Sequence, residues 1–369
     1  MTKAAELAKM GEVLTNSQIG GRRNIVINGA MQIDARNNGS SYAQINSQYN
    51  LDRFRGNSFD GGATTGKFTV QQSSTAPDDF SHSLLVTSSA STSDASNNIF
   101  NIEQLIEGFN TAHLNYGSSS AQTITLSFYV RSSLTGTFGG ALKNSARNRN
   151  YPFTYTINSA NTFERKTITI SGDTSGTWVG STNGIGLWVS FGLGVGSNYS
   201  GSAGAWGSGD YFSASGATSV VGTSGATWYI TGVQLEVGSQ ATPFEHASSF
   251  GEEQKLCHRY YQRMSRETGN GFCGVGVGPY NSTTEIFIQA VLSERMRSQP
   301  TVGISQLSDF DLEPFDVAPT GIVLHASGGG STSNVIRLQA TDSSARTKGF
   351  CGELQIDIEG GFIEFEAEL

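Results

Sequence analysis

Aromatic rings and a carboxylate stand close together in one stretch of small residues, GSNYSGSAGAWGSGDYFSAS, at residues 196–215. Proteins recognise sugars with aromatic rings that stack on the apolar faces, and with amides and carboxylates that bind the hydroxyl groups. A tryptophan exposed between glycines is unfavourable unless it packs or binds something. The carbohydrate-contact candidates are therefore Tyr199, Trp206, Asp210 and Tyr211, together with Trp178 in the similar segment SGTWVGS. The alternative is that the two tryptophans cap one end of a hydrophobic core.

The sequence lacks the residue patterns that common enzymes use. It contains no GxSxG nucleophile elbow, and its five histidines are too scattered to suggest a metal site. Some carboxylates could flank a glycosidic bond or hold calcium, but any acidic loop offers as much; they are Asp78, Asp79, Asp309, Asp311 and Glu313. We predict a protein that is not an enzyme and uses no metal or cofactor, with a surface-glycan hydrolase as a distant alternative.

Charge and hydropathy argue against two classes of partner. Lys and Arg number 23 against 31 Asp and Glu, a net charge of −8, whereas a surface that binds nucleic-acid phosphates needs clustered cations. No run of about 18 apolar residues is present, so we expect no membrane insertion. The first residues, MTKAAELAKMGEV, lack the apolar segment of a secretion signal, and we expect folding in a cytoplasm.

Alternating apolar and polar residues predict strands over most of the chain. In AQTITLSFYVRSS, the residues that fall on one face are Ile124, Leu126, Phe128 and Val130. A half-buried strand requires this two-residue period. Strand follows strand without a convincing helix between them, which indicates a mainly β fold of the sandwich or barrel type. Glycines that alternate along residues 192–196 predict close packing of another backbone on that strand.

The segment ATWYITGVQLEV closes the first set of strands. Strict alternation puts Trp228 on one face and Val233 on the other. Trp188 and Trp228 both lie inside strands and are predicted to be core residues. Pro243 prevents a return to regular pairing, so we place a first sandwich at residues 22–250.

Two segments have helical rather than strand periodicity. Residues 1–21 predict a short N-terminal anchor helix, and residues 251–266 predict a helical connector of about four turns that begins with acidic residues. The residues on the two apolar stripes are the self-association candidates: Leu7, Leu14, Leu256, Tyr260 and Met264. The alternative for each stripe is packing on its own domain. Residues 267–369 predict a second, smaller β-sandwich.

The three cysteines form no CxxC pair. We predict that Cys257, Cys273 and Cys351 are free, buried thiols that behave as small apolar residues. A disulfide between Cys273 and Cys351 is the alternative.

Three strand-rich segments together resemble a known family of phage domains. They are TITLSFYVRSSLTGTF, YPFTYTINSANTFERKTITISGDTSGTW and WYITGVQLEVGSQATPFEH. They resemble the carbohydrate-binding-module-like jelly roll of bacteriophage tail-fibre and receptor-binding proteins, especially those of marine and cyanobacterial phages. GEVLTNSQIGGRRNIVINGAMQI and GEEQKLCHRYYQ are similar to the start and end of such domains, and MRSQPTV and IEFEAEL to the module that often follows.

The resemblance implies a galactose-binding-like jelly-roll β-sandwich and a smaller sandwich, assembled as a homotrimer on the virion surface in a tail or capsid fibre. The sequence shows no long triple-helical shaft or large attachment domain, so docking to other virion proteins would use the short N-terminal helix or a partner. The implied function is recognition of a host surface polysaccharide without catalysis. The alternative is a structural virion protein, such as a capsid fibre, decoration or tail-adaptor subunit, that binds other virion proteins. Recognition requires Trp206 or Tyr211 to be exposed, whereas a structural role buries the aromatic loops between subunits.

Overall fold

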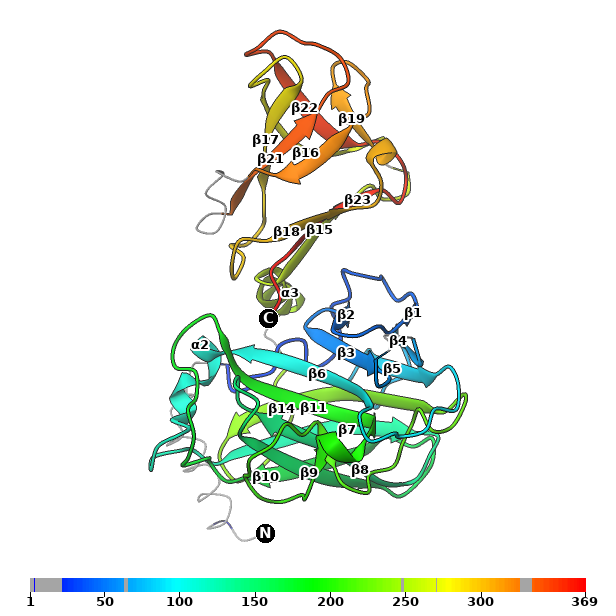
Figure 1. Ribbon diagram of the computed structural model, residues 1–369, viewed down its shortest axis with the longest axis vertical. Coiled ribbons are helices and arrows are strands. Elements are labelled where there is room, and N and C mark those ends of the chain that lie inside the picture. The colour runs from blue at the N-terminus through cyan, green and yellow to red at the C-terminus, as the bar shows by residue number, and fades with distance from the viewer. Residues whose placement is uncertain (1–2, 4–21, 63–65, 247–248, 270, 326–333) are drawn as a thin grey trace. The chain divides into compact units, whose positions relative to one another are not determined.

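The computed structural model describes residues 3, 22–62, 66–246, 249–269, 271–325 and 334–369. The fold is mainly β, as predicted, and the chain divides near residue 250 into two compact units, each with its own hydrophobic core (Figure 1). The predicted N-terminal anchor helix, with Leu7 and Leu14, lies outside the described residues.

The first unit is a jelly-roll β-sandwich of two antiparallel six-stranded sheets, between which the chain passes back and forth. In spatial order, the first sheet consists of β1 (Tyr42–Ala43), β4 (Phe68–Ser73), β5 (Ser83–Ser88), β14 (Thr227–Val237), β7 (Ile124–Ser132) and β10 (Glu164–Ile170). The second sheet consists of β2 (Gln48–Leu51), β3 (Phe54–Phe59), β6 (Ile99–Glu107), β11 (Ile185–Val195), β8 (Gly136–Lys143) and β9 (Asn150–Ile157). The connections carry α2 (Gly108–Thr111), 3₁₀ turns at Ala112–Leu114 and Ser197–Tyr199, and the parallel pair β12 (Ser200–Gly201) and β13 (Ser213–Ala214).

Large apolar side chains from both sheets fill the space between them. Trp228 and Phe128 are fully buried there, and the indole Nε1 of Trp228 donates to the Tyr155 hydroxyl at 3.2 Å. The prediction of Trp228 as a core residue is therefore confirmed. Trp188 is buried as well, but in a separate small cluster with Phe212 rather than in the central core.

Strand β14 does not keep the strict alternation that its sequence suggests. Its pairing with β7 shifts register between Thr231 and Gln234, and Gly232 between them has a φ of +60°. A bulge of this kind places an extra residue in one strand and reverses the face that later side chains occupy. Trp228 and Val233 consequently belong to the same core cluster, and the prediction that they lie on opposite faces is wrong.

Residues 192–196, at the end of β11 and just after it, are covered by other segments, as their alternating glycines predict. A Cβ atom at Gly192 would lie 2.5 Å from the Ser213 hydroxyl oxygen, and one at Gly196 would lie 2.0 Å from the Ala95 carbonyl oxygen. Only glycine allows such close approach. Strand β13 and its flanking residues are thereby held against the outer face of the second sheet.

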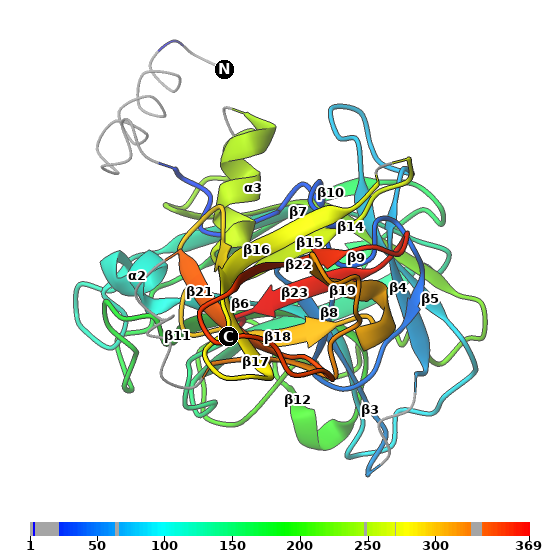
Figure 2. The same ribbon diagram turned by 90° about the horizontal axis from the view of Figure 1, so that it is seen from above.

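The second unit is a smaller β-sandwich, as predicted, of a three-stranded and a six-stranded antiparallel sheet. The third sheet consists of β15 (Tyr261–Ser265), β23 (Phe362–Glu366) and β18 (Thr301–Ile304), which lie side by side in Figure 2. The fourth sheet consists of β19 (Phe310–Glu313), β22 (Cys351–Ile356), β16 (Cys273–Pro279), β17 (Glu285–Val291), β21 (Val335–Thr341) and β20 (Gly321–Leu324). Helix α3 (Phe250–His258) precedes β15, and a 3₁₀ turn at Leu307–Asp309 precedes β19.

The predicted helical connector over residues 251–266 is only half correct. Helix α3 ends at His258, and the residues that follow pair with β23 as strand β15. Tyr260 is fully buried and Met264 packs against the core of the second unit. Leu256, Tyr260 and Met264 therefore do not form one helical stripe. An isolated helix over residues 251–266 would be only marginally stable. Its second half instead forms backbone hydrogen bonds with β23 as strand β15.

All three cysteines are free thiols. Cys257 is buried, as predicted, whereas Cys273 is partly exposed and Cys351 is exposed. The two exposed thiols lie at opposite ends of the β16–β22 pairing, where Cys273 faces Ile356 and Cys351 faces Pro279. The alternative disulfide is therefore wrong, and so is the predicted burial of Cys351.

Candidate functional site

Four aromatic side chains meet on the first unit, and we call them the aromatic cluster: Tyr116, Tyr151, Trp178 and Trp206. The ring centroids of Trp178 and Trp206 are 5.5 Å apart with an interplanar angle of 88°. Tyr116 lies 4.9 Å from Trp178 and 5.6 Å from Trp206, and Tyr151 lies 5.4 Å from Trp206. These contacts are edge to face, an arrangement that the ring quadrupoles favour. Sequence reasoning identifies the two tryptophans but misses both tyrosines.

The protein itself fixes the two indole rings. Trp178 comes from the loop between β10 and β11 and Trp206 from the loop between β12 and β13. The Nε1 of Trp206 donates to the Ser171 carbonyl at 2.6 Å, and that of Trp178 donates to the Ser175 carbonyl at 3.1 Å. Both rings are half-buried and pack against the central core. They thus cap the core, as the alternative proposes, and still expose part of their surface.

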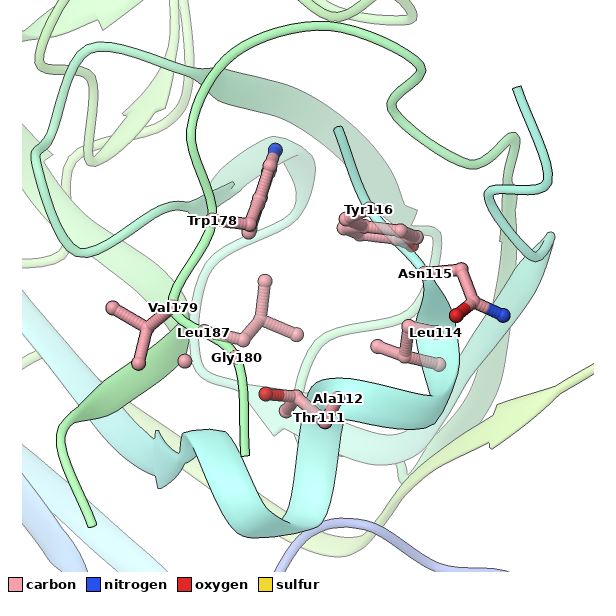
Figure 3. Close-up of a pocket in the computed structure, with 10 residues that line it drawn as sticks. Thr111, Ala112, Leu114, Asn115, Tyr116, Trp178, Val179, Gly180 and Leu187 are labelled. Carbon is pink, nitrogen blue, oxygen red and sulfur yellow. The ribbon is translucent and has the colours of Figure 1, made fainter. Parts of the chain in front are cut away.

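A hollow opens beside the cluster (Figure 3). Trp178 and Tyr116 stand on opposite sides of it, and Leu187 and Leu114 line it below these rings in the view of Figure 3. The Tyr116 hydroxyl is buried and has no hydrogen-bond partner among the described residues. Burial, and then the charge of Asp173, raise the pKa of Tyr116 well above its usual range. The hollow thus combines the aromatic rings of Trp178 and Tyr116 with the aliphatic side chains of Leu114 and Leu187.

An ion pair holds the loops of the cluster in place. Asp173 is buried and accepts Nε of Arg149 at 2.7 Å and Nη2 at 2.6 Å. Its carboxylate also accepts the Ser175 backbone N–H at 3.1 Å, and its carbonyl accepts the Gly117 N–H at 2.7 Å. A bidentate arginine gives both strength and fixed geometry. Asp173 thus ties the Trp178 loop to the segment that carries Tyr116.

Replacing Asp173 by alanine is expected to lower the free energy of unfolding of the first unit by about 2 kcal/mol, because it leaves the partly buried guanidinium of Arg149 and the Ser175 N–H without their acceptor. All four tryptophans lie in the first unit, so urea unfolding followed by tryptophan fluorescence reports this unit. The matched control is Asp60→Ala, which removes a pair with Lys67 at 3.2 Å whose side chains are 31% and 27% exposed. The control should change stability by less than about 0.5 kcal/mol, and equal effects of the two variants would contradict the role of Asp173.

The other three carbohydrate candidates are engaged in contacts outside the cluster. Asp210 accepts Nζ of Lys143 at 3.1 Å and is also ion-paired with Arg147. Tyr199 packs edge to face on Phe212, with centroids 6.1 Å apart. The ring of Tyr211 lies against the glycines at 201 and 209. The structure therefore brings Trp178 and Trp206 together but places Tyr199, Asp210 and Tyr211 along the segment that covers the second sheet.

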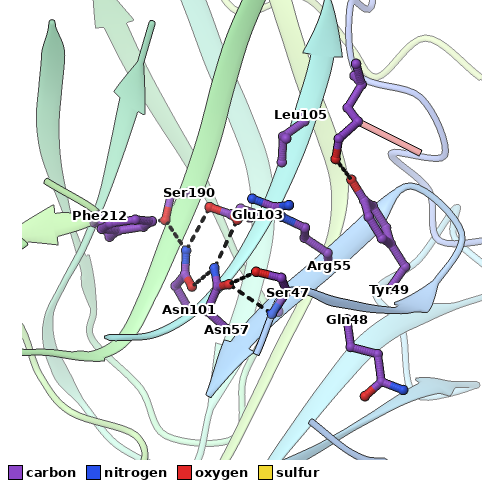
Figure 4. Close-up of polar contacts among 12 residues, drawn as sticks. Ser47, Gln48, Tyr49, Arg55, Asn57, Asn101, Glu103, Leu105, Ser190 and Phe212 are labelled. Atoms are coloured by element: carbon purple, nitrogen blue, oxygen red, sulfur yellow. Dashed lines mark hydrogen bonds and ion pairs between the residues drawn. The ribbon is translucent and has the colours of Figure 1, made fainter. Parts of the chain in front are cut away.

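A buried polar network lies beneath that segment (Figure 4). Glu103 accepts Nε of Arg55 at 2.7 Å and Nδ2 of Asn57 at 3.0 Å. Asn101 donates to the Ser190 hydroxyl at 2.7 Å and to Glu103 at 3.1 Å, and Ser190 donates to a backbone carbonyl of the covering segment at 3.1 Å. Glu103, Asn101 and Ser190 are fully buried. The network therefore anchors the covering segment to the sheet. In the sequence, this network is indicated by polar residues two positions apart in β6, Asn101 and Glu103.

Lys143 is a buried cation at the edge of this network. Its Nζ lies 3.1 Å from the centroid of the Phe212 ring and 4.5 Å from that of Trp188, besides its pair with Asp210. Burial lowers the pKa of Lys143 to about 8, against the opposing effects of Glu103 and Asp210.

The stability of the first unit is expected to rise with pH between about 8 and 10.5 because of Lys143. In this interval the unfolded chain still binds the lysine proton whereas the folded chain has lost it, so raising the pH favours the folded state. Urea unfolding of the wild type and of Lys143→Met at about pH 7.5 and about pH 10 should show the wild type gaining on the order of 2 kcal/mol relative to the variant. The variant corrects for other groups that titrate in this range. An equal dependence in both proteins would contradict the shifted pKa.

Within the described ranges, no group of three or more His, Cys, Asp or Glu side chains could hold a metal ion. Asp309 is buried and accepts the Ser305 hydroxyl at 2.6 Å and the Gln306 amide at 2.7 Å. Asp78 and Asp79 are both exposed. No helix in the same part of the chain has the length and apolarity needed to cross a membrane.

No protein-family model and no curated protein matches the sequence. Solved structures with related architecture include the enzymatically active domain of tailspike protein 4 of bacteriophage CBA120, at 13% identity and a TM-score of 0.31, over 58% of this chain and 21% of that one. A putative sugar-binding protein of Bacteroides thetaiotaomicron aligns at 12% identity and a TM-score of 0.35, over 58% of this chain and 100% of its own. A family 11 carbohydrate-binding module of Clostridium thermocellum aligns at 9% identity and a TM-score of 0.27, over 55% and 97%.

This chain thus covers about a fifth of the tailspike structure. The jelly-roll assignment follows from the strand order of the first unit itself.

Proposed function

We propose that the first unit binds a glycan at the aromatic cluster, and that the chain is a bacteriophage fibre or receptor-binding protein that recognises a host surface polysaccharide without cleaving it. The observation that carries this proposal is the pair of half-buried tryptophans, Trp178 and Trp206, fixed edge to face beside an apolar hollow. Rings held in this way lose little conformational freedom when a ligand binds.

The chemistry of the cluster suits a sugar. The CH face of a pyranose can stack on the exposed part of Trp178, while its hydroxyl groups meet the exposed amide of Asn115. The indole N–H groups are used internally, so recognition relies on ring faces. Asp173, the carboxylate that supports the cluster among the described residues, is buried against Arg149, and a pair of carboxylates for glycoside hydrolysis is not found beside it in that part of the chain.

The resemblance of the strand segments to phage receptor-binding domains supports the virion role. A homotrimer on the virion surface, docked to other virion proteins through the N-terminal segment and folded in the host cytoplasm, would present three copies of the site. Multivalent engagement raises the overall affinity by about 10²–10⁴ without a new contact, so a weak single site suffices. The second candidate function, a structural virion subunit, is favoured by one observation: three valines of the fourth sheet, Val277, Val291 and Val323, are exposed.

An array of purified bacterial surface polysaccharides, probed with the fluorescently labelled full chain, tests glycan binding. We expect binding to at least one polysaccharide and no release of reducing sugar from it over hours. Release of reducing sugar would overturn the non-catalytic role. Binding to none of a broad panel by a folded sample would favour the structural virion subunit.

A further inference from the structure

The fourth sheet has one face that nothing in the described chain covers. Its inner face carries fully buried residues of the core, such as Ile288 and Leu338. On its outer face Val277 and Val291 are each 61% exposed and Val323 is 54% exposed. Three exposed valines on one sheet face are unusual for a surface that meets only water.

One row of residues crosses this outer face from edge to edge, because each member lies directly opposite the next in the pairing of neighbouring strands. His325 completes the row directly after β20, where its N–H donates to the Arg337 carbonyl at 2.9 Å. In order, the row is Glu313, Glu353, Val277, Gln289, Arg337 and His325. It spans about 24 Å at ~4.8 Å per strand, with two acids at one end, an uncharged centre and two basic residues at the other.

The charges of three residues of the row, Glu313, Glu353 and Arg337, are not neutralised by any described residue. Glu313 and Glu353 lie opposite each other, a placement that destabilises a sheet when both are ionised. Neither carboxylate forms an ion pair with a described residue, and Arg337 forms none either; Glu313 only accepts the Gln355 amide at 3.0 Å. Beside them, burial and then the charges of Asp357, Asp316 and Glu313 raise the pKa of Asp311. Among the described residues, Glu313 and Glu353 therefore lack a cation and Arg337 lacks an anion.

We propose that the outer face of the fourth sheet is a contact between copies of this chain, in which the acidic end of the row on one copy meets the basic end on the next. A two-fold axis parallel to the strands reverses the order of the row and sets Glu353 against Arg337. In a closed ring the same two ends meet between neighbouring copies. Either arrangement removes the exposed valines from water and gives each unpaired charge a partner.

This contact is independent of the glycan site, which lies in the other unit. In this proposal the copies associate through the outer face of the fourth sheet, and not through the stripe predicted on Leu256, Tyr260 and Met264.

The test is sedimentation velocity of the full chain over a range of micromolar concentrations, with circular dichroism as a check of folding. We expect the wild type to associate, and Arg337→Glu to weaken association at least tenfold by placing acids at both ends. Glu353→Arg should do the same, and the double variant Glu353→Arg/Arg337→Glu should restore association because it reverses the row and keeps its ends complementary. Arg295→Glu, at an exposed cation outside the six strands, is the matched control and should associate like the wild type.

Val277→Asn is a second variant, which makes the uncharged centre of the row polar without adding a charge, and it too should weaken association. A wild-type chain that is monomeric throughout this range would overturn the proposal. So would association that none of the charge variants changes, or a double variant that is as weak as the single ones.

Discussion

Replacing Trp178 by alanine is expected to weaken binding of the recognised polysaccharide about 30-fold or more, the effect of removing a central aromatic contact worth at least about 2 kcal/mol. Trp178 is the ring that joins the cluster to the hollow: it contacts both Tyr116 and Trp206 and lines the hollow itself. Because the ring is half-buried, the variant should also lose on the order of 1 kcal/mol of stability. It should therefore remain folded under the conditions of the binding measurement.

Titration of the polysaccharide found on the array into the variant, followed by calorimetry, measures this effect. Tyr42→Ala is the matched control, because Tyr42 is also an aromatic residue of the first unit and is 47% exposed, but on the edge strand β1. The control should bind like the wild type. A Trp178→Ala variant that binds with unchanged affinity would place the glycan elsewhere, and equal losses in both variants would indicate a general effect of removing aromatic surface.

Replacing Trp228 by alanine is expected to lower the free energy of unfolding of the first unit by about 3–5 kcal/mol. Trp228 is fully buried between the two sheets, 6.0 Å from the Phe191 ring between centroids. Its removal leaves a large cavity and takes away the indole donor of the buried Tyr155 hydroxyl. Urea unfolding followed by the fluorescence of the three remaining tryptophans measures the change.

The comparison for this variant is Trp228→Phe, which keeps an aromatic ring in the core and should lose clearly less, about 1–2 kcal/mol. A loss below about 1 kcal/mol for alanine would mean that the core of the sandwich does not depend on this side chain.

The alternating strands could be predicted from the sequence because each of them buries at least one face. The bulge in β14 could not, since Gly232 adopts a left-handed φ to place an extra residue opposite β7, and nothing in the alternation of ATWYITGVQLEV marks that position. The single extra residue in β14 places Val233 on the core face of the sheet, the opposite of the predicted face.

The connector shows why local periodicity is weaker evidence than long-range pairing. Leu256, Tyr260 and Met264 recur at a helical spacing, yet the last of them lies in β15 opposite Ile363 of β23. A short helical pattern competes poorly with a strand partner that lies about a hundred residues further on and is itself strictly alternating.

From the sequence, the candidate site could be predicted only by the types of its residues, not by which of them meet. Tryptophans between small residues were a sufficient signal for Trp178 and Trp206, but their meeting with Tyr116 depends on three separate loops. The sequence likewise could not show that Asp210 serves as the acceptor of Lys143 and Arg147. Acidic and aromatic residues that are neighbours in the chain thus serve different parts of the unit.

The central claim is that the chain recognises a bacterial surface glycan through the aromatic cluster. The most direct measurement is staining of a panel of intact bacterial strains with the fluorescently labelled full chain, before and after mild periodate oxidation of their surface sugars. We expect that a subset of strains is stained, that oxidation abolishes the staining, and that Trp178→Ala reduces it strongly while Tyr42→Ala does not. Absence of staining by the folded wild type across the panel, or staining that survives both periodate and the Trp178 substitution, would contradict it.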